Sequence, residues 1–317
     1  MTAAQKISLI SPCYNEADVI GRFYEAVKKT LNQMPDIEHE IIFVDDGSTD
    51  ETPTILKRLA QSDPRLRVII LSRNFGHQLA LTAGIDHATG DAVIMMDSDL
   101  QHPVELLPEM VAHWKSGSDI VSTLRSDTED SGLFKSFSSK IFYLLFNRLS
   151  PTYLPVGAAD FCLLSKNVYT QLQLMRERHR FLRGLICWVG FSKKMIPYHA
   201  AAREAGVSKY SMTKMIRLAA DAILSFSCKP LTAAVRIGFF LTFTGFLYLL
   251  YILYGFFIRK NLVPGWASLI CTLLILNGFQ LIFIGLIGEY ISRIFDEVKK
   301  RPMYIIKEQS GKIEEST

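Results

Sequence analysis

The sequence predicts an α/β domain with a mostly parallel sheet, followed by an amphipathic segment and two transmembrane helices. Three observations carry this prediction. Over the first 200 residues, short apolar runs rich in β-branched residues alternate with segments of helical spacing. Polar clusters follow directly after four of these runs, where parallel strands of open α/β sheets present their ligand-binding ends. Near the C-terminus, two apolar stretches each lack charge for more than twenty residues.

Five apolar runs predict the strands, and the segments between them predict the helices. The predicted strands are Lys6–Ser11, Glu40–Val44, Arg67–Leu71, Ala92–Met96 and Asp119–Thr123. The predicted helices are Glu16–Leu31, a segment capped by Thr49 or Asp50 that runs to Ala60, Gly76–Ala88, and Pro103–Trp114, which opens on a proline. Strands that are apolar on both faces and joined by helices are typical of a parallel sheet covered on both sides.

Two uncharged stretches predict the transmembrane helices. Ile237–Ile258 holds 22 residues and Asn261–Gly288 holds 28, and a spanning helix needs about 20. Arg259-Lys260 and Pro264-Gly265 mark a short turn between them. The alternative, a pair of buried core helices, is disfavoured because core helices rarely remain uncharged for so long.

Charges flanking the two stretches predict their orientation. The upstream flank from Arg203 to Arg236 carries six basic and two acidic residues. Four more basic residues follow the second stretch, namely Arg293, Lys299, Lys300 and Arg301. Positively charged flanks remain in the cytosol, and two spans place both flanks on one side. Met1 to Leu9 contain no apolar run long enough for a signal peptide, so we expect the N-terminal domain to be cytosolic.

Lys214–Phe226 has apolar residues at helical spacing with a basic edge. Because it directly precedes a predicted span, we expect it to lie on the membrane face, although an ordinary surface helix packed on the domain is the open alternative. The expected organisation is a cytosolic α/β domain over residues 1–205, an amphipathic interfacial segment over 206–230, transmembrane helices over 231–258 and 266–292, and a cytosolic tail over 293–317.

Composition excludes several functional classes. The formal charge of +4 is too small to predict a nucleic-acid partner. Five cysteines without a C-x-x-C pair argue against a disulfide framework or a zinc cluster and fit a reducing compartment. The sequence has no G-x-G spacing and no Gly-Lys-Ser/Thr, so neither a Rossmann dinucleotide fingerprint nor a P-loop is present. A nucleoside diphosphate held through a metal remains compatible with these absences.

Four polar clusters follow the predicted strands. They are Tyr14-Asn15-Glu16, Asp45-Asp46, Arg73-Asn74 and Asp97-Ser98-Asp99. Any one of them could be a helix cap or turn, but four at equivalent positions indicate a ligand site. Asp97 and Asp99 are two residues apart and can face one hard cation, Mg²⁺ or Mn²⁺, with Gln101 or His102 as a further ligand or a supporting residue.

The combined motifs resemble those of family 2 glycosyltransferases with the GT-A fold. They are SPCYNE (Ser11–Glu16), VDDGSTD (Val44–Asp50), LSRNFGHQLALTAG (Leu71–Gly84) and DSDLQHP (Asp97–Pro103). More narrowly, the chain resembles the polyprenyl-phosphate glycosyltransferases, which include dolichol-phosphate mannose synthase and the bactoprenol glucosyltransferases. Supporting stretches are GAADFCLLSKNV (Gly157–Val168), REAGVSKYS (Arg203–Ser211) and the two spans. The resemblance implies a GT-A, Rossmann-like catalytic domain at a bacterial plasma membrane.

The resemblance also implies roles for individual residues. Pro12, Tyr14, Glu16 and Asp46 would hold the nucleoside, and Asn15, Asn74, Gln78 and Ser98 of the same clusters are further candidates for binding the nucleotide sugar. Asp97, Asp99 and Gln101 would hold the metal and, through it, the diphosphate. Asp160 matches a carboxylate near the sugar. Basic positions that contact phosphates are Arg125, Lys135 and Arg203, and Lys209 with Tyr210 lies where a lipid headgroup would enter. Among all these, Asp160, Asp99, Arg125 and Arg203 are the expected catalytic residues.

The expected activity is inverting, metal-dependent transfer of a hexose, glucose from UDP-glucose, to polyprenyl phosphate. Other sugars (aminoarabinose, mannose or an N-acetylhexosamine) remain open because a few hydroxyl contacts select the sugar. A processive polysaccharide synthase is disfavoured, since no tryptophan follows an arginine as the Gln-x-x-Arg-Trp motif requires. A non-catalytic membrane scaffold is a further alternative, and the retained aspartates argue against it. The oligomeric state is left open, including a homo-oligomer.

Overall fold

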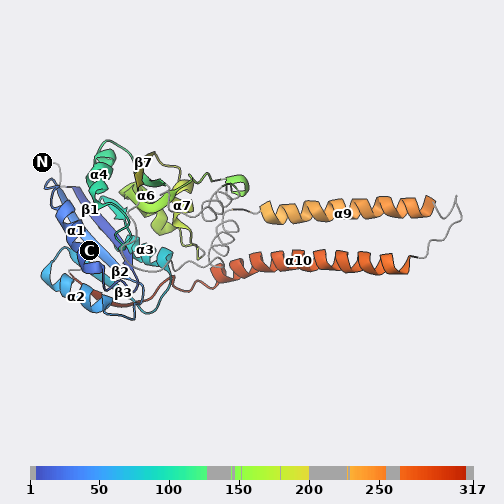
Figure 1. The fold of residues 1–317 in the computed structure, drawn as a ribbon, viewed down its shortest axis with the longest axis horizontal. Coiled ribbons are helices and arrows are strands. Elements are labelled where there is room, and N and C mark those ends of the chain that lie inside the picture. The colour runs from blue at the N-terminus through green and yellow to red at the C-terminus, as the bar shows by residue number, and fades with distance from the viewer. Residues whose placement is uncertain are drawn as a thin grey trace. The chain divides into compact units, whose positions relative to one another are not determined.

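The computed structural model describes residues 5–126, 144, 147–150, 152–178, 180–199, 227, 229–254 and 265–311. Contacts divide the chain into two compact units. The first unit contains the β-sheet, the helices that cover it and the residues after 300. The second contains the two long C-terminal helices (Figure 1). The predicted combination of an α/β sheet with two apolar C-terminal helices is confirmed.

The sheet has eight strands in the order β7-β5-β6-β4-β1-β2-β3-β8. Their bounds are β1 Gln5–Cys13, β2 Ile37–Asp45, β3 Leu66–Leu71, β4 Ala92–Met95, β5 Ile120–Ser126, β6 Ala158–Ser165, β7 Lys193–His199 and β8 Ile306–Ser310. The strands β4, β1, β2 and β3 form a parallel centre, as the apolar runs predict. The carboxyl ends of these four strands therefore meet at one edge of the sheet.

Two strands run against the others and were not among the predicted elements. β6 lies between β4 and β5 and is antiparallel to both. β8 is antiparallel to β3 at the far edge of the sheet. β5 therefore does not neighbour β4, although it points the same way and pairs in parallel with β7. The insertion of β6 matters for the site, because it carries Asp160 to the end of β4.

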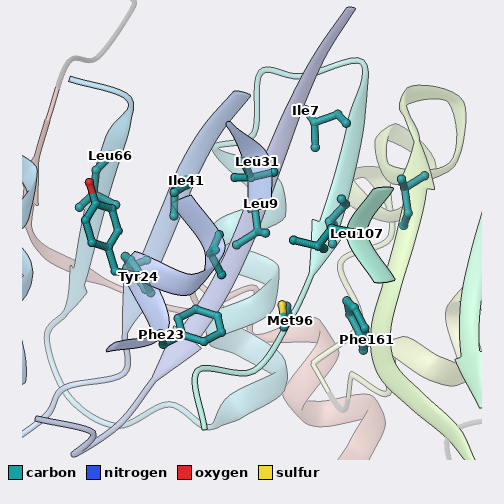
Figure 2. Packing of buried hydrophobic residues seen from close by; sticks show 14 of the residues in the cluster. Ile7, Leu9, Phe23, Tyr24, Leu31, Ile41, Leu66, Met96, Leu107 and Phe161 are labelled. Carbon is teal, nitrogen blue, oxygen red and sulfur yellow. The ribbon is translucent and has the colours of Figure 1, made fainter. Parts of the chain in front are cut away.

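One face of the sheet is covered by α1 (Ile20–Leu31), α2 (Thr52–Ser62) and α4 (Leu107–Lys115), which follows the short 3-10 helix η1 (Val104–Leu106). The buried side of α1 repeats at helical spacing, and its Phe23 and Tyr24 pack in one cluster with Ile7 and Leu9 of β1. Figure 2 shows this packing, with Leu107 of α4 and Phe161 of β6 in the same layer.

The opposite face is covered by α3 (His77–Asp86) and α6 (Lys166–Leu174), which contact β1, β2, β4 and β6. Alternate residues of β1 point to this side, and Ile10 packs directly against Gly84 of α3. A Cβ atom at Gly84 would lie only 2.2 Å from Cγ2 of Ile10, so the glycine permits this close approach. The Tyr169 hydroxyl of α6 donates to the carbonyl of Gly90 at 2.7 Å. A further short helix, α7 (Leu182–Trp188), contacts β6 and α6.

The residues after 300 belong to the first unit rather than forming a separate tail. The backbone N–H of Ser72 donates to the carbonyl of Ile305 at 2.8 Å, next to the β3–β8 pairing. The Tyr304 hydroxyl donates to Asp86 Oδ2 at 2.8 Å, and Lys57 Nζ lies 2.6 Å from Glu308 Oε2. The chain before α9 and the chain after α10 thus form one sheet.

The second unit contains α9 (Lys229–Tyr254) and α10 (Trp266–Val298). Both are long and apolar enough to cross a membrane, and their hydrophobic windows are almost entirely exposed. Helices that are apolar all round and bury little of their own surface match a lipid environment. α10 continues to Val298, past the 266–292 range that the sequence indicates. Most of the predicted interfacial segment over 206–230 lies outside the described residues.

Candidate active site

The four polar clusters predicted at the strand ends are joined by hydrogen bonds at one edge of the sheet. The backbone N–H of Asp46 donates to the carbonyl of Cys13 at 2.9 Å, which joins the ends of β1 and β2. The Ser98 hydroxyl donates to the carbonyl of Pro12 at 3.1 Å, which joins the ends of β1 and β4. The ends of β1, β2 and β4 are therefore joined directly, and Asp46 joins the loop after β3 to them through the N–H groups of Phe75 and Gly76.

Asn15 joins the loop after β1 to the loop after β2 through hydrogen bonds. Its backbone adopts a left-handed conformation with φ of 54°, which asparagine tolerates better than most residues. Its N–H donates to the Ser48 hydroxyl at 2.8 Å, and its Oδ1 accepts from the N–H of Thr49 at 2.9 Å. The next N–H, of Glu16, donates to the Thr52 hydroxyl at 2.9 Å. Asn15 and Glu16 therefore join the loop after β1 to the loop after β2.

Asp46 holds the loop after β3 against the end of β2. Its carboxylate accepts from the N–H groups of Phe75 at 2.7 Å and Gly76 at 2.9 Å. Burial of the side chain raises its pKa, although these two donors oppose the shift. Gly47 makes the approach possible, because a Cβ there would lie 2.4 Å from the backbone carbon of Arg73. Beneath it, Oδ1 of the fully buried Asp45 has no hydrogen-bond partner in the described part of the chain.

Asp97 follows β4 and contacts His77 at the start of α3. His77 Nε2 lies 2.7 Å from Asp97 Oδ1. Burial disfavours the imidazolium, but the negative charge of Asp97 outweighs it and raises the pKa of His77 to about 9. Burial likewise disfavours the carboxylate, yet His77 holds the pKa of Asp97 well below its usual range. His77 therefore carries a positive charge against Asp97 at neutral pH.

Asp160 of β6 forms the third part of the site. Arg183 of α7 binds it with two bonds, Nε to Oδ1 at 2.7 Å and Nη2 to Oδ2 at 2.8 Å. His77 Nδ1 lies 4.0 Å from Asp160 Oδ2, so His77 stands between the two aspartates. Burial would raise the pKa of Asp160, but the Arg183 guanidinium lowers it. Asp160 is only 8% exposed and remains a carboxylate.

The loop that carries Asp99 is shaped by its own backbone and by His102. Asp99 Oδ1 accepts from the N–H of Gln101 at 3.1 Å, and Leu100 between them has a left-handed φ of 59°. His102 Nδ1 accepts the N–H of Asp97 at 3.2 Å, and its ring stacks on Phe161 with centroids 5.0 Å apart. Burial lowers the pKa of His102, which favours the neutral ring that this bond needs.

The donor chemistry of this loop fits a hard divalent cation. Asp97 and Asp99 offer carboxylate oxygens, and both follow the buried end of β4. Among the described residues, no three histidine, cysteine or acidic side chains group closely enough to hold a metal by themselves. Mg²⁺ commonly takes one or two carboxylates and completes its shell with phosphate oxygens and water. The residues present therefore fit a metal shared with a diphosphate ligand.

Of the other candidate residues, some lie beside the site and others lie outside the described residues. Gln78 Oε1 accepts the N–H of Leu182 at 2.9 Å and so connects α3 to α7. Asn74 is exposed beside the Asp46 loop, and Arg125 is exposed at the end of β5, where its N–H donates to the carbonyl of Gly157 at 2.9 Å. Four predicted phosphate-binding residues lie outside the described residues, namely Lys135, Arg203, Lys209 and Tyr210.

Arg183 is the functional candidate that sequence reasoning missed. It is one of several arginines between positions 176 and 183, and no motif or spacing distinguishes it from the others. His77 lies within the motif LSRNFGHQLALTAG, but the sequence gives no sign of its contact with Asp97. Both residues are identified only by the contacts that the fold brings about.

Curated relatives match almost the whole chain. The SfII prophage-derived bactoprenol glucosyl transferase of Shigella flexneri is 42% identical over 302 residues, covering 95% of this chain and 97% of the relative. The prophage bactoprenol glucosyl transferase homolog of Escherichia coli K12 is 41% identical, with coverage of 95% and 98%. An uncharacterized glycosyltransferase of Bacillus subtilis, YkcC, is 40% identical, with coverage of 96% and 94%.

Solved structures resemble the fold at lower identity. Mannosyl-3-phosphoglycerate synthase from Rubrobacter xylanophilus has a TM-score of 0.48 at 17% identity, with coverage of 73% of this chain and 75% of that chain. Glucosyl-3-phosphoglycerate synthase from Mycobacterium tuberculosis, crystallised with Mn²⁺, UDP-glucose and phosphoglyceric acid, has a TM-score of 0.45 at 20% identity, with coverage of 70% and 78%. Residues 8–172, just over half of the chain, match the family described as Glycosyl transferase family 2. With that match and relatives about 40% identical over nearly its full length, the chain belongs to glycosyl transferase family 2.

Proposed function

We propose that this protein transfers glucose from UDP-glucose to a polyprenyl phosphate at the cytosolic face of a membrane. The observation that carries the proposal is the similarity of about 40% identity to bactoprenol glucosyl transferases over nearly the whole chain, which includes both apolar helices. The anionic site at the carboxyl end of the sheet supports it. A non-catalytic scaffold has no reason to retain these aspartates in contact with histidine and arginine.

The reaction needs little proton transfer. A phosphate oxygen of the lipid attacks C1 of glucose, the bond from C1 to the donor's phosphate oxygen breaks, and UDP leaves from the opposite face. The configuration at C1 is inverted, and the products are UDP and polyprenyl phosphoglucose. Because the attacking oxygen is already anionic near neutral pH, the site requires positioning and charge compensation rather than a strong general base.

We assign the residues of the site as follows. Pro12, Tyr14, Asn15, Glu16 and Asp46 hold the nucleoside, with Asn74, Gln78 and Ser98 as further residues of the nucleotide-sugar site. Asp97 and Asp99, with Gln101, hold a divalent cation, Mg²⁺ or Mn²⁺. When bound, this cation would neutralise charge that develops on the departing diphosphate.

We assign basic residues to bind the polyprenyl phosphate acceptor. Arg125, Lys135, Arg203 and Lys209 offer cations, and Tyr210 a hydroxyl, for the phosphates, and the two arginines can bind phosphate with two parallel bonds. Asp160 faces the hexose. Its paired carboxylate offers further lone pairs to sugar hydroxyls without needing to take up a proton.

The two apolar helices give the proposal its location. Each buried CH₂ of a lipid chain contributes about 0.8 kcal/mol to membrane binding, so a polyprenyl chain stays in the bilayer and the enzyme must come to it. We propose that α9 and α10 are two spans. Since β8 follows α10 and pairs with β3, both ends of this helical pair join one folded unit and lie on one side. The positive flanks favour the cytosol for that side.

Purified full-length protein in detergent tests the proposal. It is incubated with Mg²⁺, a short polyprenyl phosphate and a panel of radiolabelled donors: UDP-glucose, UDP-N-acetylglucosamine, GDP-mannose and UDP-aminoarabinose. We expect labelled lipid from UDP-glucose, loss of at least about 100-fold in Asp99→Asn, and no product in the presence of EDTA. Product from a different donor would change the sugar, and no lipid product from any donor would favour the scaffold.

A further inference from the structure

Asp97, which follows β4, and Asp160 of β6 both lie near His77 at the centre of the site. β4 and β6 are antiparallel, and their register pairs Ala92 with Ser165 and Met95 with Cys162. Extending this register two residues past its last pair would set position 97 opposite position 160. Like charges placed opposite each other across strands are destabilising. The fold must therefore supply positive charge between and behind Asp97 and Asp160.

Arg183 meets this requirement at Asp160, and His77 contacts Asp97. His77 contacts Asp97 at 2.7 Å and stands 4.0 Å from Asp160. Arg183 occupies both oxygens of Asp160 through its Nε and Nη2 atoms. A two-bond pair between a guanidinium and a carboxylate fixes the plane of the carboxylate as well as its position. The remaining lone pairs of Asp160 are thereby aimed in one direction.

Arg183 is itself held in place by the site. Leu182, the residue before it, donates its N–H to Gln78 Oε1 at 2.9 Å. Gln78 follows His77 at the start of α3, and its Nε2 lies 3.4 Å from His77 Nδ1. The first residues of α7 and α3 are therefore connected next to the two aspartates. The backbone from which Arg183 reaches Asp160 is thereby fixed, which lets the guanidinium orient the carboxylate.

We propose that Arg183 is a positioning residue that orients Asp160 toward the hexose of the donor. This inference deepens the proposed function and rests on it. Arg183 acts through Asp160, so its loss should disturb the chemical step on the donor side and leave capture of the lipid phosphate unchanged. An arginine that instead bound the lipid phosphate directly would affect acceptor binding.

Full-length Arg183→Gln, Arg183→Lys and Asp160→Asn variants and the Asp160→Asn/Arg183→Gln double variant test the inference in detergent. For Arg183→Gln we expect kcat to fall about 100-fold, the loss that a small misplacement of a reacting group produces. The KM for polyprenyl phosphate should stay within about twofold of the wild-type value. Arg183→Lys keeps the charge but not the two-bond geometry and should recover about tenfold of the lost rate.

The double variant separates positioning from an independent role. If Arg183 acts through Asp160, the double variant should be no slower than Asp160→Asn alone. Rate losses that multiply in the double variant would overturn the inference. So would an acceptor KM raised about tenfold or more with kcat little changed, which would place Arg183 on the lipid phosphate.

Arg176 provides a matched control. It pairs with Asp86 through Nη1 and Oδ2 at 2.7 Å, on the same unit but away from the site. Arg176→Gln should leave kcat and both KM values unchanged.

Thermal unfolding of the same variants tests whether Arg183 and Asp160 are coupled even if the wild type transfers no sugar, an outcome that would contradict the proposed function. The two single variants should each lower the unfolding midpoint, and the double variant should lower it by less than their sum. Additive shifts would mean that the two side chains are not coupled, and would overturn the inference without bearing on the sugar donor.

Discussion

Glu40 is the most heavily bonded carboxylate of the sheet, and replacing it should destabilise the protein without affecting catalysis. It is 5% exposed in β2. Its Oε1 accepts from the Ser8 hydroxyl at 2.5 Å and from the N–H and hydroxyl of Thr89 at 2.9 and 2.8 Å. Its Oε2 pairs with Lys6 at 3.6 Å and Arg67 at 3.4 Å. Glu40 precedes Asp46 by six positions, about 20 Å along an extended strand, so it is remote from the site.

Glu40→Gln keeps one oxygen acceptor but turns an NH₂ group toward Lys6 and Arg67. Hydrogen bonds to a charged group contribute about 1.5–3 kcal/mol each, and those to a neutral group about 0.5–1.5 kcal/mol. The weakened bonds and lost ion pairs together should lower the free energy of unfolding by about 2–3 kcal/mol. For a unit of this size that corresponds to a fall of about 5–10 °C in the unfolding midpoint.

The pH dependence follows from the direction of the shift. Burial would raise the pKa of Glu40, but the bonds from Ser8 and Thr89 outweigh it and lower the pKa. A carboxylate whose pKa is lowered by folding stabilises the protein above its unfolded pKa, and this stabilisation is lost as the pH falls through the folded value. The difference between wild type and Glu40→Gln should therefore be full at neutral pH and shrink below about pH 4.

Intrinsic fluorescence during heating in detergent measures both effects. Glu38→Gln is the control, because Glu38 lies two residues away on the same strand and is exposed. Equal midpoints for Glu40→Gln and Glu38→Gln would refute the reasoning, as would a difference that persists unchanged at pH 3. A large loss of glucose transfer in Glu40→Gln at a temperature where it remains folded would refute the separation of this residue from the site.

Two further changes test the packing of the first unit. Gly84→Ala should lower the free energy of unfolding by about 1–3 kcal/mol, because the new Cβ would lie 2.2 Å from Ile10 Cγ2. In thermal unfolding, the double variant with Ile10→Ala should lose less than the sum of the two single losses, and additive losses would contradict the contact. Tyr304→Phe removes the hydrogen bond to Asp86 and should lower the free energy of unfolding by about 1 kcal/mol. It should also speed tryptic cleavage near Lys307. An unchanged digestion pattern would mean that this bond does not hold the C-terminal strand in place.

Local sequence pattern predicted five strands, the helices between them and the two long apolar helices, but not β6, β7, β8, α6 or α7. The parallel centre of the sheet follows from apolar runs separated by helical segments, and each predicted strand contains or overlaps an observed one. The helix over Glu16–Leu31 begins later than predicted, at Ile20, because Glu16 instead closes a turn in which its carbonyl accepts from the N–H of Val19 and Ile20. The N-cap of α2 is Glu51 rather than the predicted Thr49 or Asp50, although Asp50 Oδ1 accepts the N–H of Thr52 at 3.0 Å.

The contacts between side chains within the site were less predictable from the sequence. The proximity of Asp97 and Asp160 depends on the register between β4 and β6, which lie more than sixty residues apart in the sequence. The bond between Asp160 and Arg183 depends on where a seven-residue helix docks on that strand. Neither relation leaves a periodic signal in the sequence, because hydrophobic periodicity reports which face of an element is buried and not which element buries it.

The amino-acid sequence by itself determined strands β1 to β5, helices α1 to α4 and the two long apolar helices, and which strand ends carry polar side chains. These properties depend on neighbours a few positions apart. Only the tertiary structure decided that β6 enters the sheet antiparallel beside β4, that β8 closes the far edge, and that His77 and Arg183 neutralise two facing aspartates. Such contacts join distant residues, and their stability arises from burial and charge compensation that exist only once the chain has folded.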